Sequence, residues 1–160
     1  MTTVAFTLAG QPYSKANRRQ LVPPSRHDDG AHARLIKSPE ALRYERDALM
    51  QIPPHCRVRF AEPVCVTLHL YYASERADLD ESLLLDVLQD RWKAVTIGHV
   101  KTRVLIQAGV YRNDRQVREK HVFHHIDQRH PRAEIRVEPL GSPSGVQPER
   151  QGENREPEAT

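Results

Sequence analysis

The chain has 160 residues, with 24 Lys and Arg against 21 Asp and Glu and a formal net charge of +3. This length supports one domain with a hydrophobic core. No run approaches the roughly 20 apolar residues that a membrane span needs. Because residues 141–160 hold two basic and four acidic residues, residues 1–140 carry +5. That excess permits a polyanionic partner without demanding one.

Cys56 and Cys65 are the two cysteines of the sequence, and the N-terminus lacks the pattern of a secretion signal. A charged segment followed by an apolar stretch is absent from residues 1–6. We therefore expect reduced thiols and a cytoplasmic protein with no membrane partner.

The first part of the chain predicts one strand, one helix and two loops. Residues 4–8 alternate and favour a strand, which Gly10-Gln11-Pro12 ends. Residues 14–19 form a basic loop, and residues 23–37 lack periodicity and predict a mobile loop. A helix is expected over 38–51, because Ser38 suits the N-cap, a proline follows, and Pro53-Pro54 stops it.

The second part predicts three strands and a second helix. Residues 64–72 alternate clearly, with Val, Val, Leu, Leu and Tyr on one face. Leucines at helical spacing indicate a helix over 81–88, and residues 116–123 and 133–138 favour two more strands.

These elements define an α+β fold, a small mixed sheet packed with two main helices. We expect one domain over residues 1–140, with an insertion at about 90–106. Residues 141–160 have almost no apolar content and are expected to be disordered, because they cannot offset the entropy of ordering.

Asp78-Leu79-Asp80 joins the third predicted strand to the second helix. In an extended segment, residues two apart share a face, with Cα atoms roughly 6–7 Å apart. Two carboxylates so placed suit hydrated Mg²⁺, or a two-metal centre for phosphodiester hydrolysis. The alternative is that Asp80 caps the helix and Asp78 is a turn residue.

A third carboxylate, Asp114, lies in the segment 113–116 (Asn-Asp-Arg-Gln) just before a predicted strand. Such a segment is also typical of a turn. Alone, neither acidic motif distinguishes a metal site from local backbone hydrogen bonding.

Taken together, the two blocks resemble the RusA family of Holliday junction resolvases. Segment 76–81 (Arg-Ala-Asp-Leu-Asp-Glu) precedes a leucine-rich helix, and segment 108–117 (Ala-Gly-Val-Tyr-Arg-Asn-Asp-Arg-Gln-Val) opens the next strand, as in that family. The N-terminal strand, the segment 12–19 and the last strand are similar too, so the resemblance spans roughly residues 4–139.

The resemblance implies a homodimeric endonuclease that hydrolyses branched DNA such as a four-way junction. Its metal-binding aspartates match Asp78, Asp80 and Asp114 of this chain, with Mg²⁺ as cofactor and Mn²⁺ as a substitute. Metal-activated water would leave 5′-phosphate and 3′-hydroxyl ends. A two-fold dimer suits a junction, since symmetric sites can nick opposed strands.

The chain departs from the family pattern beside the aspartates. Glu81 stands where the family has Asn and adds a further candidate metal ligand. The family's helix lysine has no counterpart, because residues 82–85 read Ser-Leu-Leu-Leu. Since a cation can stabilise the scissile phosphate, we expect a replacement among Lys15, Lys120 and Arg115.

The expected DNA contacts come from cationic side chains, which position a nucleic acid without reading its sequence. The candidates are Lys15, Arg18, Arg19, Arg76, Arg115 and Lys120. The insertion is also basic, and Trp92 within it either stacks on an unpaired base or packs inward.

A histidine cluster, His121, His124, His125 and His130, suggests zinc. We disfavour such a site, because the cysteines are distant in the sequence and His124 and His125 point to opposite faces of an extended segment.

Two other functions fit the same residues. A DNA-binding module that has lost catalysis would bind junctions without nicking them. A protein-interaction domain would use its acidic residues only as caps and turns.

Overall fold

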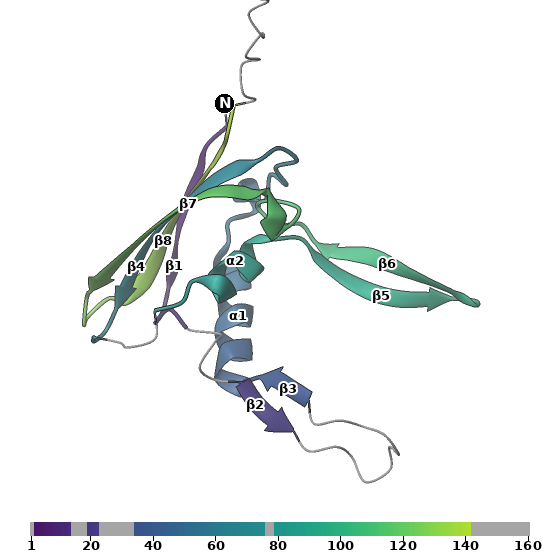
Figure 1. The fold of residues 1–160 in the computed structure, drawn as a ribbon, viewed down its shortest axis with the longest axis horizontal. Coiled ribbons are helices and arrows are strands. Elements are labelled where there is room, and N and C mark those ends of the chain that lie inside the picture. The colour runs from purple at the N-terminus through teal and green to yellow at the C-terminus, as the bar shows by residue number, and fades with distance from the viewer. Residues whose placement is uncertain (1, 14–18, 23–33, 76–78, 142–160) are drawn as a thin grey trace, which may run out of the picture.

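The computed structural model describes residues 2–13, 19–22, 34–75 and 79–141. Within these residues, a sheet of four strands forms the centre of the molecule, in the order β1-β8-β4-β7 (Figure 1). The strands are β1 (Val4–Ala9), β4 (Val64–Tyr72), β7 (Val117–Ile126) and β8 (Arg132–Pro139). β8 runs antiparallel to β1 and β4, whereas β4 and β7 are parallel. The expected mixed sheet is therefore confirmed.

Two α-helices, α1 (Pro39–Gln51) and α2 (Ser82–Leu88), pack on the same face of this sheet (Figure 1). The start of α1 follows the prediction, since the Ser38 side chain accepts a hydrogen bond from the Ala41 amide at 3.2 Å. Parallel strands need a crossover, and α2 with the segment after it supplies the one between β4 and β7.

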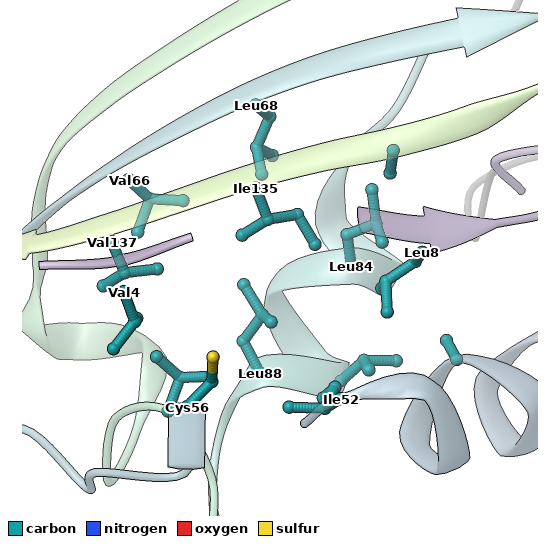
Figure 2. Close-up of a cluster of buried hydrophobic side chains, with 14 of the residues drawn as sticks. Val4, Leu8, Ile52, Cys56, Val66, Leu68, Leu84, Leu88, Ile135 and Val137 are labelled. Atoms are coloured by element: carbon teal, nitrogen blue, oxygen red, sulfur yellow. The ribbon is translucent and has the colours of Figure 1, made fainter. Parts of the chain in front are cut away.

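The core lies between the sheet and the two helices. Alternation along β4 directs Val64, Val66, Leu68 and Leu70 toward the helices, where each is fully buried. Figure 2 shows Val66 and Leu68 beside Val137 and Ile135 of β8, in the same cluster as Leu84 and Leu88 of α2 and Ile52 just after α1. Burial of this apolar surface is what holds the helices to the sheet.

The opposite face of the sheet is not covered by any described helix or strand (Figure 1). Each residue of β4 and its partner in β7 lie on the same face of the sheet, because paired residues of parallel strands point the same way. Every second pair lies on this uncovered face. We call it the open face. On it lie Cys65, Thr67, His69 and Tyr71 of β4 and Glu119, His121, Phe123 and His125 of β7.

The insertion predicted at about 90–106 coincides with a two-stranded hairpin, β5 (Arg91–Ile97) and β6 (Val100–Gln107). It stands away from the sheet and helices (Figure 1). Its tip is apolar and exposed, with Ile97 and Val100 each 68% accessible.

A second hairpin, β2 (Arg19–Val22) and β3 (Arg34–Lys37), corrects part of the sequence analysis. Residues 34–37 belong to a strand, although the whole of 23–37 was expected to be a loop. This strand has four residues, too few for an alternating pattern that would predict it from the sequence. Its backbone groups are satisfied by pairing with Arg19–Val22, which is a non-local effect.

The segment 109–111 is held between two others by backbone hydrogen bonds. Phe60 donates to the Val110 carbonyl at 2.9 Å, and Val110 donates to the Leu88 carbonyl at 2.7 Å. The buried Asp90 carboxylate accepts from the Gly109 amide at 2.8 Å and from the Arg59 guanidinium at 2.8 and 3.1 Å. This joint fixes the end of α2 against the residues that precede Asp114.

Among the described residues, no helix is both long and apolar enough to pass through a membrane.

Replacing Gly109 with Ala should destabilise the fold by about 3 kcal/mol, at the upper end of ordinary overpacking. An added Cβ would lie 2.4 Å from the Gln89 carbonyl carbon and 2.6 Å from the Asp90 nitrogen, and backbone cannot rotate away. Urea denaturation measures the loss. Gly98→Asn is the control, since nothing lies within 4 Å of its Cβ position and Asn tolerates the left-handed φ of 62°. Equal denaturation midpoints for both variants would contradict the claim that the backbone around Gly109 leaves no room for a Cβ atom.

Candidate functional site

The structure describes some of the predicted site residues and not others. Lys15, Arg18, Arg76 and Asp78 lie outside the described residues, and for Arg19 only the backbone, in β2, is described. Asp80, Glu81, Asp114, Arg115 and Lys120 are described in full.

Asp80 lies just before α2 and binds its first residue. Its carboxylate accepts one hydrogen bond from the Ser82 amide and another from the Ser82 hydroxyl, both at 2.9 Å. A carboxylate at a helix start satisfies a free amide and suits the positive end of the dipole. Asp80 thus binds the start of the helix, but the N-cap position belongs to Glu81, whose side chain makes no capping hydrogen bond.

Glu81 forms an ion pair with Lys120, which reaches it from β7. Lys120 is in register with Val66, so it lies on the face of the sheet that carries the helices. Of the three cations considered as replacements for the family lysine, Lys120 is thus beside the start of α2. It contacts the residue that stands in the family's Asn position.

Asp114 begins the short 3₁₀ helix η2 (Asp114–Gln116), which Asn113 and Gln116 close with reciprocal side-chain bonds. The predicted turn at this segment is therefore confirmed. Asp114 is exposed, and its amide donates to the Gln89 side chain at 3.4 Å. Gln89 directly follows the last residue of α2, so Asp114 lies near the helix end opposite to Asp80.

Tyr111 connects Asp114 to a carboxylate that the sequence analysis did not single out, Asp86. The buried Tyr111 hydroxyl donates to the Leu85 carbonyl at 2.8 Å. Burial raises the pKa of Tyr111, and the nearby Asp114 and Asp86 carboxylates raise it further. Tyr111 therefore stays protonated as a donor, with two carboxylates close by. The sequence does place Asp86 on the predicted leucine-rich helix beside the acidic motif, and this position could have marked it as a further candidate.

Asp80, Glu81 and Asp114 are thus distributed along α2, a helix about 10 Å long at 1.5 Å per residue. Over the ranges that the structure describes, no group of three ligand atoms close enough to share a metal ion includes any of them. Asp78, the remaining member of the predicted trio, is outside those ranges.

A different group does converge. The ligand atoms of Cys65, Glu119 and His121 all lie within 4.8 Å of one another on the open face, so this triad could hold a metal ion. Burial raises the pKa of the Cys65 thiol, and the Glu119 and Glu138 carboxylates raise it further. The negative charge that opposes a thiolate here would favour a cation.

This triad was missed because no local pattern joins its members. Cys65 and His121 are distant in sequence, which was the reason for disfavouring zinc, but the parallel pairing of β4 with β7 brings them together. The second reason, that His124 and His125 face opposite ways, is borne out. His125 meets His69 on the open face at 3.0 Å between ring nitrogens, while His124 stacks with Tyr72, which is buried on the other face.

The base of the β5–β6 hairpin presents an aromatic and cationic surface. Trp92 is 43% exposed, and the Arg103 guanidinium lies 5.8 Å from the centre of its ring. Inward packing of Trp92, one of the two alternatives drawn from the sequence, does not occur. A hollow of about 570 Å³ is lined by Trp92, Arg103, Arg112 and Arg59 with Gln89, Asp90 and Asn113.

A charged network lies beside Asp86. The buried Glu45 carboxylate accepts hydrogen bonds from Lys37 at 2.7 Å and from Arg91 at 2.5 Å, and Lys37 is 3.9 Å from Asp86. The network links β3, α1 and β5, and so ties both hairpins to the helical layer.

No protein-family model matches the chain, and no curated protein matches it.

The Glu45 network predicts a pH-dependent loss of stability. Burial alone would raise the pKa of Glu45, but hydrogen bonds from Lys37 and Arg91 outweigh it and hold the pKa below its ordinary 4.5. The stabilisation is then complete above 4.5 and is lost as the pH falls through the folded-state pKa.

Glu45→Gln should therefore be less stable than wild type at neutral pH, with the gap in unfolding free energy closing in acid. Denaturant titrations across the acidic range measure this gap. Glu75→Gln, a change at an exposed residue, is the control and should show a small gap at every pH. A Glu45→Gln gap that does not depend on pH would refute the role of the network.

Proposed function

We propose that this protein is a Mg²⁺-dependent endonuclease that selects branched DNA, of the type that the RusA resemblance implies. The observation that carries the proposal is the ion pair between Glu81 and Lys120 next to Asp80. Through this pair, Lys120 of β7 brings a cation to the start of α2, where residues 82–85 include no lysine.

The donors around α2 are of the type that the proposed metal prefers. Asp80, with Asp78, would hold Mg²⁺ at the start of the helix, where Glu81 is a further oxygen ligand. Asp114 lies near the opposite end and, among the described residues, forms no three-ligand group with Asp80 and Glu81. Carboxylate oxygens are the ligands that this ion prefers, and it keeps waters and substrate phosphates as the rest of its coordination. When bound, the metal would supply an activated water and stabilise the leaving oxygen.

The chain's own residues would do the remaining work. The Lys120 ammonium, 41% exposed, can exchange Glu81 for a phosphate oxygen and so orient the scissile group. Tyr111 stays a neutral donor and fixes the position of the segment that leads to Asp114.

Cationic groups around the β5–β6 hairpin supply the proposed DNA surface. Lys93, Lys101 and Arg103 are exposed on the two strands, and Arg112 and Arg115 are exposed on either side of Asp114. Trp92 offers a ring on which an unpaired base at a branch point can stack. A homodimer would place two such surfaces around a four-way junction, one for each nicked strand.

Asp80→Asn should lower cleavage of a four-way junction by about 100-fold or more, the scale of losing one group that stabilises charge in a transition state. The substitution removes the charge and keeps an acceptor oxygen for the Ser82 amide, while the new amide group replaces the oxygen that accepts from the Ser82 hydroxyl. Single-turnover cleavage with Mg²⁺ gives the rate. Asp47→Asn, an exposed change on α1, is the matched control and should cut like wild type. Equal cutting by wild type and Asp80→Asn would sink the nuclease assignment.

Lys120→Met should lower the cleavage rate at saturating DNA by about 10- to 100-fold and leave affinity nearly unchanged. Lys101→Met, in the hairpin, should do the reverse, because a phosphate contact mainly adds affinity and salt dependence. Rates and dissociation constants measured on the same junction separate the two effects. If the Lys120 change alters affinity alone, Lys120 has no part in the chemistry.

A second candidate is a module that binds branched DNA without cutting it. The observation in its favour is that both Asp80 oxygens already bind Ser82 while Asp114 lies near the other end of α2. It predicts junction binding with a steep salt dependence and no nicking at any Mg²⁺ concentration.

A further inference from the structure

The triad of Cys65, Glu119 and His121 lies on the open face of the sheet, away from every residue assigned to DNA cleavage above. Asp80 and Glu81 belong to the start of α2, and Lys120 points to the helix side of β7. The proposed nuclease gives the triad no role.

An irregularity in the pairing of β4 with β7 sets the composition of the triad. Val64 pairs with Val117, but Cys65 pairs with Glu119, so the register passes over Arg118. A β-bulge of this kind re-aims the side chains that follow it. Without the shift, Cys65 would have a guanidinium beside it. With the shift, a carboxylate takes that place and His121 follows beside Thr67.

The surroundings of the thiol favour a cation. Cys65 is 5% exposed, and its neighbour Thr67 forms a hydrogen bond with the thiol. Glu119 and Glu138 both bring negative charge to it, which outweighs the smaller positive contribution of Arg136. Glu138 faces Cys65 from β8 and is itself held by Arg136 at 3.0 Å. Glu138 is not part of the group whose ligand atoms converge, which leaves three protein ligands and one position for water.

The donor types select the class of ion. Thiolate, imidazole and carboxylate together suit zinc and similar divalent transition metals, whereas Mg²⁺ prefers oxygen ligands alone. Bonds of about 2.0–2.3 Å need the three ligand atoms closer than their present 4.8 Å limit. Glu119 and His121 are exposed and can close this distance by side-chain rotation.

We propose that Cys65, Glu119 and His121 form a binding site for a zinc-class divalent transition metal, with water as the fourth ligand. As the metal–sulfur bond forms, the thiol proton is released to solvent and no electron is transferred. Glu119 and His121 are exposed to solvent, so the site is open to ions on this face, and a hollow of about 720 Å³ that Thr67 and Glu138 help to line lies beside it.

The test is a titration of the full chain, stripped of metal and kept reduced, with Co²⁺ as the spectroscopic probe. One Co²⁺ should bind per chain and give a near-ultraviolet thiolate-to-cobalt band with the visible bands of a four-coordinate ion. Zn²⁺ should displace it, and a large excess of Mg²⁺ should not. A wild-type chain without the thiolate band would overturn the proposal.

Substitutions assign the ligands. Cys65→Ser should abolish the thiolate band. Because Cys65 is nearly buried and this change could disturb folding, His121→Ala and Glu119→Gln are the main variants, and each should weaken Co²⁺ binding by about tenfold or more. His130→Ala is the control, since its side chain is 79% exposed and lies outside the triad. Wild-type affinity in His121→Ala would refute the site, whatever the result of the junction assay.

Discussion

The buried Asp90 carboxylate is the constraint on which the rest of the arrangement depends. It is fully inaccessible and is balanced by the Arg59 guanidinium and the Gly109 amide. A buried charge without such partners would cost several kcal/mol, so the three groups are compatible with the fold only together. They join three stretches of chain that are far apart in the sequence: the residues after α1, the end of α2 and the segment that leads to Asp114. The spacing between the acidic residues of α2 and Asp114 follows from this joint.

The one-sided sheet divides the molecule into two chemical environments. The helix side carries oxygen ligands and a lysine, which suits phosphate chemistry and a hard cation. The open side carries sulfur, imidazole and aromatic groups, which suits softer ligands. β7 serves both sides through strict alternation, because Lys120 points to one face while Glu119 and His121 point to the other. A single strand thereby contributes to both candidate sites without mixing their ligands.

Sequence reasoning succeeded where the determinant is local. The alternation of 64–72, the Ser38 cap and the leucines of α2 each predicted an element that the structure contains. It failed where pairing is long-range: residues 34–37 became a strand through Arg19–Val22, and Cys65 met His121 through a parallel pairing. The Asp80 contact with Ser82 was foreseeable, being two residues away, whereas the Lys120–Glu81 pair needed the β7 register. The sequence shows that residues 82–85 include no lysine. That Lys120 lies beside this helix could be learned only from the fold.

The β5–β6 hairpin has a mechanical consequence. β5 leaves α2 after Gln89 and Asp90, and β6 returns through Ala108 and Gly109 to the segment that leads to Asp114. Both arms of this ribbon are therefore rooted at the same stiff fulcrum, and its apolar tip lies at the far end (Figure 1). Any partner that binds the exposed tip therefore holds a ribbon whose two ends lie in the same hydrogen-bonded joint that positions Asp114.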